Sequence, residues 1–248
     1  IAGILLIKSV IKEVAQKEEI EKLSVYKTEL LSVVAHQIRN PLVAIRGYSS
    51  LGVANFQLKK DEIFMKIGLA AGKLINLLNN LLDLSHIEEG KMSYDFNKIE
   101  INKFLKEIVD EFKFLAENKG LEIIFNSASE DVIIEGDNYK LSQAFKNLID
   151  NAIKYTEKGW IKIEVSADIK EKNVLTTISD SGRGISREFI EKAFNKFSRQ
   201  IEDERILGSG LGLYISKKII EDHRGEIWAE SDEKKGGSKF TVSLPIFP

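Results

Sequence analysis

The sequence contains no cysteine, only three histidine residues and no His-Glu-x-x-His pattern. Without cysteine, disulfides, thiolate metal sites and a cysteine nucleophile are excluded. The few histidines also argue against a dedicated zinc enzyme. Net charge is lacking too, because 36 Lys and Arg residues nearly balance 38 Asp and Glu residues and leave a net charge of −2. This balance excludes a strongly basic protein, so no nucleic-acid partner is expected.

The chain begins with an apolar run that is too short to cross a membrane. As a helix, Ile1–Ile7 spans about 10 Å, against a hydrocarbon core of about 30 Å. It is either the last part of a transmembrane helix, with Lys8 and Lys12 on the cytoplasmic side, or the end of an upstream sensor or linker helix. Because the first residue is not Met, we expect a piece of a longer protein. The expected location is cytoplasmic, either as a separate protein or as the cytoplasmic part of a membrane-attached sensor.

Two helices with apolar seams are predicted near the start of a sequence that is 43% hydrophobic and 30% charged, as is typical of a globular protein. The first runs from about Lys17 to Asn55, and the second from the N-cap Asp61 to Glu89-Gly90. Two parallel apolar stripes on the second helix predict more than one neighbouring helix. Two hairpins from two chains would supply them in a four-helix bundle, so a homodimer is expected; alternatively, the second domain covers the extra face. The stripes are Ile63, Ile67, Ala70, Leu74, Leu77, Leu81 and Leu84, and Phe64, Ala71, Ile75, Leu78 and Leu82.

The rest of the sequence alternates predicted strands and helices, which indicates an α/β domain after the hairpin. The predicted fold class is therefore α+β with two domains. Helices are predicted at Lys103–Asn118, Leu141–Tyr155, Arg187–Ala193 and Gly212–His223. Strands are predicted at Ile99–Ile101, Leu121–Phe125, Val132–Ile134, Trp160–Ala167, Asn173–Ser179, Glu226–Glu230 and Lys239–Leu244.

Polar residues share one face of the predicted helix Leu141–Tyr155. Asn147, Asn151, Lys154 and Tyr155 recur at helical spacing, opposite the apolar face. Two carboxamide oxygens one turn apart, with a lysine beyond them, can hold a hydrated Mg²⁺ and the phosphates that it bridges. The alternative is a solvated polar face that binds nothing.

Two glycine-rich segments carry further candidates. Asp180-Ser181-Gly182-Arg183-Gly184 follows a predicted strand, where Asp180 can accept a hydrogen bond from an exocyclic amine such as that of adenine. Gly208-Ser209-Gly210-Leu211-Gly212 leads into a helix whose amide groups can receive phosphate. It matches neither the P-loop nor the dinucleotide-binding pattern. The polar stretch between the two glycine segments is interpreted as a mobile lid, in which Arg199 or Arg205 can meet the charge of a phosphate. The alternatives are that the segment at Asp180 is an ordinary strand-to-helix turn and that the polar stretch is a charged surface loop.

His36 shares one face of the first predicted helix with Ser32 and Asn40, beside the apolar seam. Pro41 cannot donate to the carbonyl of Gln37, so it loosens the helix one turn after the histidine. An exposed neutral imidazole at such a place can act as a nucleophile near neutral pH. A single surface histidine usually has no function, so this prediction depends on the other motifs.

Five motifs together resemble those of two-component sensor histidine kinases, in the family's order and with ordinary spacings. The resemblance covers about Glu18 to the C-terminus and is specific because all five occur in register. It implies a dimerising phosphotransfer hairpin and a Bergerat-type sandwich, a mixed sheet with helices on one face, as in gyrase-type ATPases. The expected domains are a linker or sensor-helix end at 1–19, the hairpin at 20–92 and the ATP-binding domain at 93–248. The motifs are HQIRNPLVAIRGYSSL (36–51), NLIDNAIKYT (147–156), DSGRGIS (180–186), FNKFSR (194–199) and GSGLGLYISKKII (208–220).

The resemblance implies roles for residues of this chain. His36 would accept the phosphoryl group, Asn151 would be the Mg²⁺ ligand in the motif that begins at Asn147, and Asp180 would bind the adenine amine. Contacts to ATP, or a place in the lid over it, are implied for Lys154, Tyr155, Gly182, Gly184, Phe197, Arg199, Gly208, Gly210, Leu211 and Gly212.

One residue departs from the family pattern. Gln37 stands where the family usually has Glu or Asp, whose carboxylate can take the imidazole proton during transfer. A carboxamide only accepts a hydrogen bond, and a positioned base typically contributes about 10²–10⁴-fold, so transfer is expected to be slower without being abolished. Asn40 matches the position at which the family's Thr or Asn is associated with phosphatase activity on the partner receiver.

These observations predict an ATP-dependent autokinase that phosphorylates His36 and passes the phosphoryl group to an Asp of a response-regulator receiver domain. The alternative is a phosphatase-biased sensor in which Gln37 and Asn40 orient water. A non-enzymatic, nucleotide-binding scaffold ranks third, because the glycines and both asparagines are intact. A gyrase-like or chaperone-like ATPase would share the pocket without needing the hairpin that carries His36.

Overall fold

The computed structural model describes residues 17, 32–51, 60–168, 170–198, 209–231 and 236–247. The chain divides into two compact units, Ile1–Asn79 and Asn80–Pro248. The division lies inside the long helix α2 (Lys60–Glu88), so the last turns of α2 belong to the second unit. The domain boundary expected after residue 92 stays a prediction. Among the described helices, none is both long and apolar enough to span a membrane.

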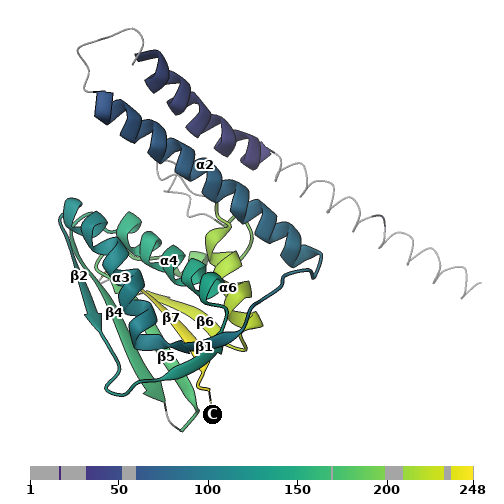
Figure 1. The fold of residues 1–248 in the computed structure, drawn as a ribbon, viewed down its shortest axis with the longest axis vertical. Coiled ribbons are helices and arrows are strands. Elements are labelled where there is room, and N and C mark those ends of the chain that lie inside the picture. Colours follow the sequence, from purple (N-terminus) through teal and green to yellow (C-terminus); the bar gives the residue numbers. More distant parts are fainter. Residues whose placement is uncertain are drawn as a thin grey trace, which may run out of the picture. The chain divides into compact units, whose positions relative to one another are not determined.

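Two helices that run antiparallel side by side form the described part of the first unit (Figure 1). The first covers residues 32–51 and continues through Pro41; of the rest of its predicted span, only the helical Lys17 is described. Because α2 begins at Lys60, the prediction that Asp61 is its N-cap is wrong. Asp61 lies in the first turn instead, where a negative charge stabilises the helix dipole. The predicted end of the helix is confirmed, since α2 ends at Glu88 and Gly90 follows with φ +64°.

The apolar side chains of α2 fall into a buried set and an exposed set. Ile63, Ala70 and Leu77 are buried at seven-residue intervals, which is the spacing of a seam between paired helices. Phe64, on the second predicted stripe, is 69% exposed, and other large apolar side chains near it are exposed as well. Within the described residues of a single chain, this apolar face of α2 is therefore not covered. The exposed set of α2 is Phe64, Met65, Leu69, Ile75, Leu78 and Leu82.

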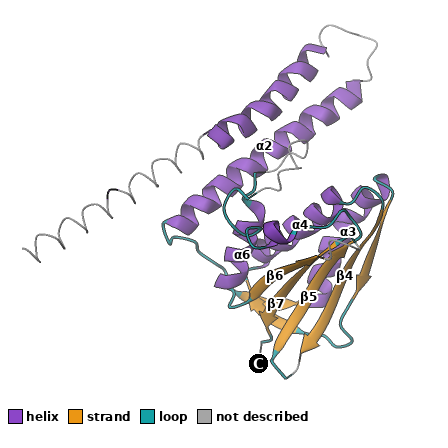
Figure 2. Ribbon diagram, turned by 180° about the vertical axis from the view of Figure 1, so that it is seen from behind, coloured by secondary structure: helices purple, strands orange, loops and turns teal. Residues whose placement is uncertain are grey.

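The second unit is a five-stranded mixed sheet with helices packed on one face (Figure 2). The strand order is β2-β4-β5-β7-β6, with β2 parallel to β4 and the other neighbours antiparallel. β1 and β3 form a separate antiparallel pair. The predicted α+β class and mixed sheet are thus confirmed. The strands are β1 (Asn97–Glu100), β2 (Leu121–Asn126), β3 (Ile133–Gly136), β4 (Gly159–Asp168), β5 (Asn173–Asp180), β6 (Glu226–Ser231) and β7 (Ser238–Pro245).

The helices of this unit are α3 (Ile101–Asn118), α4 (Asn138–Tyr155), α5 (Arg187–Ile190) and α6 (Gly212–Asp222). Several predicted boundaries are wrong, including the start of α3 and the end of α5. Ile101 begins α3 rather than ending a strand, because the Glu100 carboxylate accepts hydrogen bonds from the backbone N–H groups of Asn102 and Lys103, both at 2.9 Å. The helix predicted to reach Ala193 ends at Ile190 and continues as turns. Fully buried side chains from helices and sheet form the core, among them Leu105, Phe145, Leu148, Ile149, Ile161, Ile163, Ile178 and Ile215.

The last turns of α2 pack within the second unit through a buried carboxylate. Asp83 is 7% exposed and accepts hydrogen bonds from Lys140 Nζ at 2.8 Å and from Gln143 Nε2 at 2.6 Å, both on α4. Further on, the Tyr94 hydroxyl donates to Asp222 at the end of α6, at 2.5 Å. The contacts of Asp83 are made at the N-terminal half of α4, whereas the candidate residues on α4 lie in its C-terminal half.

Candidate functional site

His36 is exposed on the helix formed by residues 32–51. Its ring Nδ1 lies 3.4 Å from Nδ2 of Asn40, one turn further along the same helix face. Gln37, the next residue in the chain, is partly buried. The imidazole is therefore accessible, and its nearest polar partner is the carboxamide of Asn40.

Asn147 and Asn151 occupy successive turns of α4, whose opposite face is buried against the sheet. Asn147 donates a hydrogen bond through Nδ2 to Ser216 Oγ on α6, at 2.9 Å. A Cβ placed on Gly212 would lie 2.2 Å from Asn147 Oδ1, so a larger residue at the start of α6 would displace the Asn147 carboxamide. Asn147 thus joins the two helices, while Asn151 lies one turn beyond that contact.

Two cations lie near the aromatic ring at the C-terminus of α4. Lys154 Nζ and the guanidinium carbon of Arg183 are each 5.2 Å from the centroid of the Tyr155 ring. Lys119 stabilises the same helix end, because its Nζ donates to the backbone carbonyls of Ile153 at 2.6 Å and Lys154 at 3.2 Å. The result is a group of positive charges beside the last turn of α4, where the charge of a phosphate would be favoured.

Asp180 ends β5 and is 5% exposed. Its carboxylate accepts hydrogen bonds from the Gly182 backbone N–H at 2.8 Å and from the Ser238 hydroxyl. Burial raises the pKa of the Asp180 carboxyl, against these hydrogen bonds, which favour the charged form. A Cβ on Gly182 would meet Tyr155 O at 2.5 Å and Asp180 Oδ1 at 2.8 Å, so glycine is required for space at this position.

The glycine segment before α6 is built on unusual backbone conformations. Gly210 has φ +67°, and a Cβ there would lie 2.7 Å from the backbone carbon of Phe197. Phe197 itself has φ +61°, a left-handed conformation that is uncommon for an aromatic residue. Leu211 is fully buried and anchors the start of α6. Gly184, with φ +80°, lies beside Ser231 and Gly237, while the predicted Arg199 and Gly208 lie outside the described residues.

The structure brings together several pairs of predicted residues, among them His36 with Asn40, Asn147 with Gly212, Asp180 with Gly182, Lys154 with Tyr155, and Phe197 with Gly210. The sequence reasoning missed four residues that contact these groups, namely Ser216, Ser238, Arg183 and Lys119. Arg183 and Ser216 lie inside quoted motifs and could have been noticed. Ser238 and Lys119 act across the sheet or between helices, and no local pattern marks them.

The polar groups around Asp180 and Asn151 are suited to a nucleotide with its metal ion. Within the described ranges, no group of three or more His, Asp or Glu side chains could hold a metal. Asn147 is held between the two helices by the bond from its Nδ2 to Ser216, and the assignment of the metal ligand to Asn151 stays a prediction. Beside Asp180, the hydroxyl of Thr156 is fully buried and helps to lower the pKa of the Asp180 carboxyl, against the effect of burial.

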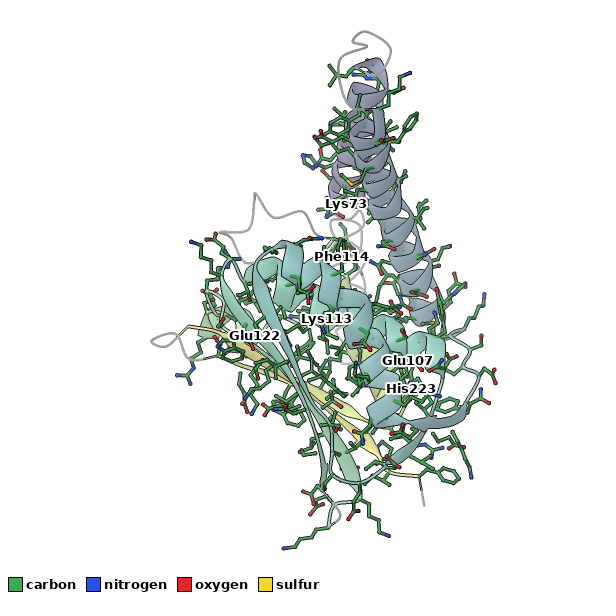
Figure 3. All side chains as sticks on the ribbon, turned by 60° about the vertical axis from the view of Figure 1, so that its left-hand side comes forward. Lys73, Glu107, Lys113, Phe114, Glu122 and His223 are labelled. Atoms are coloured by element: carbon green, nitrogen blue, oxygen red, sulfur yellow. The ribbon has the colours of Figure 1, made fainter. Side chains whose placement is uncertain are left out.

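His223 is a buried histidine at the end of α6, and it should make the stability of the protein depend on pH (Figure 3). Asp137 N–H donates to His223 Nε2 at 2.9 Å, and Nδ1 lies 2.7 Å from the carbonyl oxygen of Ile219, so the ring is neutral with its proton on Nδ1. Burial lowers the pKa of His223. Below the ordinary histidine pKa of about 6.5, the unfolded chain gains a proton that the folded chain does not take up. Stability should therefore fall as pH drops below about 6.5, by at most about 1.4 kcal/mol per pH unit.

Urea unfolding between pH 7.5 and 5.5 measures this slope. His223→Gln should flatten it, because Gln keeps an acceptor for the Asp137 N–H and does not titrate. His86→Gln is the matched control, since His86 is exposed on α2. An unchanged slope in His223→Gln would contradict the prediction.

An accessible histidine on a helical hairpin and a separate sheet domain with a buried aspartate fit a nucleotide-dependent phosphotransfer protein. Residues 26–90 match the family model of the His Kinase A (phospho-acceptor) domain. Residues 136–248 match the model of the histidine kinase-, DNA gyrase B- and HSP90-like ATPases. The chain belongs to the two-component sensor histidine kinases, and its two domains are those of a protein-histidine kinase.

Known relatives agree with this assignment. The sensor histidine kinase WalK of Bacillus subtilis is 32% identical over 235 residues, which cover 92% of this chain and 38% of WalK. The histidine-protein kinase BaeS of Escherichia coli is 30% identical over 232 residues, which cover 92% of this chain and 48% of BaeS. The chain thus spans less than half the length of these two relatives.

Solved structures of histidine kinases have the same architecture. Histidine kinase ThkA, in complex with the response regulator TrrA, is 28% identical with a TM-score of 0.65, over 92% of this chain and 64% of that chain. Acinetobacter baumannii AdeS is 22% identical with a TM-score of 0.66, over 86% of this chain and 98% of AdeS, and shows the fold alone.

Proposed function

We propose that the chain autophosphorylates on His36, using Mg²⁺-ATP as phosphoryl donor, and passes the phosphoryl group to an Asp of a response-regulator receiver domain. The observation that carries the proposal is the exposed imidazole of His36, which lies in the stretch matched by the phospho-acceptor model. An ATPase-type domain in the same chain supplies the donor site.

In this mechanism, the chain mainly positions groups and neutralises charge. The Asp180 carboxylate, buried and already hydrogen-bonded, accepts from the adenine amine and sets where the nucleotide lies. Lys154 and the glycine segment that ends at Gly212 receive the phosphates, with Tyr155 and Arg183 beside them. Asn151 would hold Mg²⁺ through its carboxamide oxygen, and the ion would supply positive charge to neutralise the phosphates.

His36 acts as the nucleophile through a ring nitrogen that carries no proton. That nitrogen bonds to the terminal phosphorus while the bond from phosphorus to the ADP oxygen breaks, and ADP leaves with the electron pair. Gln37 cannot take up a proton as a carboxylate would, so the step lacks a general base, which typically contributes about 10²–10⁴-fold. We expect slow but measurable transfer.

The assembly follows from the uncovered apolar face of α2. A second copy of the chain that covers Phe64, Leu78 and their neighbours would complete a four-helix bundle, so a homodimer is proposed. The receiver partner is proposed by analogy with ThkA, whose structure contains a response regulator. The proposal also includes three domains: a linker or sensor-helix end at 1–19, the phosphotransfer hairpin at 20–92 and the ATP-binding domain at 93–248. It further includes a cytoplasmic location and an upstream sensor or membrane segment.

Incubation of the wild-type chain with γ-labelled ATP and Mg²⁺ tests the kinase directly. The label should be acid-labile and alkali-stable, as expected for a phosphohistidine, and should move to an added receiver domain. No label, or a label stable to acid, would contradict the proposal.

A phosphatase-biased protein is the second candidate, and the approach of Asn40 to His36 favours it. Asn40 and Gln37 would then orient a water molecule for attack on the phosphorylated receiver, and ATP would only set the conformation. The lifetime of the phosphorylated receiver, with and without the chain, decides this. Equal lifetimes would reject a phosphatase.

A further inference from the structure

The contact between Asn40 and His36 involves one particular ring nitrogen. Asn40 Nδ2 lies 3.4 Å from His36 Nδ1, and the two residues are four positions apart on one helix, where side chains are neighbours. The histidine is exposed, whereas Asn40 is partly buried and so is more restricted in its orientation. Nδ1 therefore faces the chain itself, and Nε2 is the nitrogen left for a phosphoryl donor.

The two ends of a carboxamide have opposite effects on the imidazole. A neutral imidazole carries one proton, and only the other nitrogen has a lone pair for attack. If the Asn40 Nδ2 donates to Nδ1, the ring proton must lie on Nε2, which is then not nucleophilic. If the carboxamide is turned by half a rotation, Oδ1 accepts from Nδ1–H and Nε2 keeps its lone pair. Both orientations occupy nearly the same space, because this terminal torsion is roughly two-fold.

We propose that Asn40 is a positioning residue for phosphoryl transfer, whose carboxamide orientation selects the reactive tautomer of His36. With Oδ1 toward His36, the ring carries its proton on Nδ1 and Nε2 attacks; with Nδ2 toward His36, the ring is held in the unreactive tautomer. This inference rests on the proposed function. It gives Asn40 a role in phosphoryl transfer, in addition to the orientation of a water molecule in the phosphatase alternative.

The transfer step balances without a base on the chain. The lone pair of Nε2 forms the bond to phosphorus, and the bond from phosphorus to the ADP oxygen breaks. Nδ1 keeps its proton in the hydrogen bond to Asn40 Oδ1 while positive charge develops on the ring. After ADP leaves, that proton is released from Nδ1 to water. Asn40 accepts a hydrogen bond throughout and never takes up the proton, which matches the lack of a carboxylate at Gln37.

The tautomer can be measured directly on the full chain by ¹⁵N NMR of the histidine ring, in alkaline solution where an ordinary imidazole is neutral. In the structure Nδ2 faces Nδ1, the orientation that holds the unreactive tautomer, so Asn40→Ala should raise the ratio of Nδ1–H to Nε2–H tautomer about 3- to 10-fold, the equilibrium effect of one hydrogen bond. Asn40→Asp, which offers only acceptor oxygens, should raise the ratio by a similar factor. Ser32→Ala is the matched control, because Ser32 lies four residues before His36 on the same helix, and it should leave the ratio unchanged.

Autophosphorylation rates connect the tautomer to the reaction. Asn40→Ala and Asn40→Asp should both raise the maximal rate, by about 3- to 10-fold, because neither keeps the Nδ2 donor that holds the unreactive tautomer, and the KM for ATP should be unchanged in both. An identical tautomer ratio in wild type and Asn40→Ala overturns the inference, whatever the rates are, since a purely structural role would alter stability and not the ratio. A shifted ratio in a chain that never becomes labelled would instead refute the proposed kinase and leave the selection of the tautomer intact.

Discussion

His36→Ala should lose essentially all of the acid-labile label that the wild-type chain takes from γ-labelled ATP. The imidazole is the nucleophile in the proposed reaction, and alanine offers no lone pair to form the bond to phosphorus. Removing a residue that forms the covalent intermediate typically costs at least about 10³-fold, so the remaining label should lie at background. Autoradiography after an alkaline gel, in which phosphohistidine survives, measures the loss.

The fold and the nucleotide site should be unaffected by this change. His36 is exposed, and substitutions at such positions usually alter the free energy of unfolding by less than about 0.5 kcal/mol. ATP affinity should also remain, because no predicted nucleotide contact lies on this helix. His86→Ala, which removes an exposed histidine from α2, is the matched control and should be labelled like wild type. Equal labelling of His36→Ala and wild type would reject His36 as the phospho-acceptor.

Most elements of the α/β unit could be predicted because each is encoded locally. Leu141, Phe145 and Leu148 recur at helical spacing, and all three are buried on α4. The helix begins three residues earlier than predicted, at Asn138, because the Asp137 carboxylate caps it by accepting from Lys140 N–H at 3.0 Å. The periodicity of apolar residues thus predicts that a helix exists, whereas a polar cap outside the apolar pattern determines where it begins.

The contacts that organise the candidate site were harder to predict, because they join distant segments. Asp180 and Ser238 are 58 residues apart, and they meet only because β5 and β7 pair in a register that places them opposite each other. Helical spacing places Asn147 and Asn151 on one face but cannot distinguish them. The difference comes from α6, whose Ser216 engages Asn147. A local pattern therefore identifies candidate residues, and their separate tasks follow from tertiary packing.

Asp180→Asn should weaken ATP binding about 10- to 150-fold while the chain stays folded. The proposed contact is a hydrogen bond from the adenine amine to a buried carboxylate, and hydrogen bonds to charged groups contribute about 1.5–3 kcal/mol. Asparagine has the same shape, and the Ser238 hydroxyl can rotate to accept from its NH₂ group. Because burial raises the pKa of Asp180, the charged form is costly to bury, and the neutral carboxamide removes that cost. Titration calorimetry with ATP, together with a thermal melt, measures both effects.

Inosine triphosphate shows whether the loss arises at the adenine amine, because its base carries an oxygen at that position. Wild type should prefer ATP over inosine triphosphate, and Asp180→Asn should reduce this preference by about 10-fold or more, since the charged acceptor that reads the amine is gone. Asp168→Asn is the matched control: it makes the same chemical change at the other end of the β4–β5 hairpin, where Asp168 accepts from Lys170 N–H and Glu171 N–H in the turn. It should bind both nucleotides like wild type. If Asp180→Asn kept the full preference for ATP, another group would have to recognise the adenine amine, and Asp180 would only stabilise the loop at Gly182.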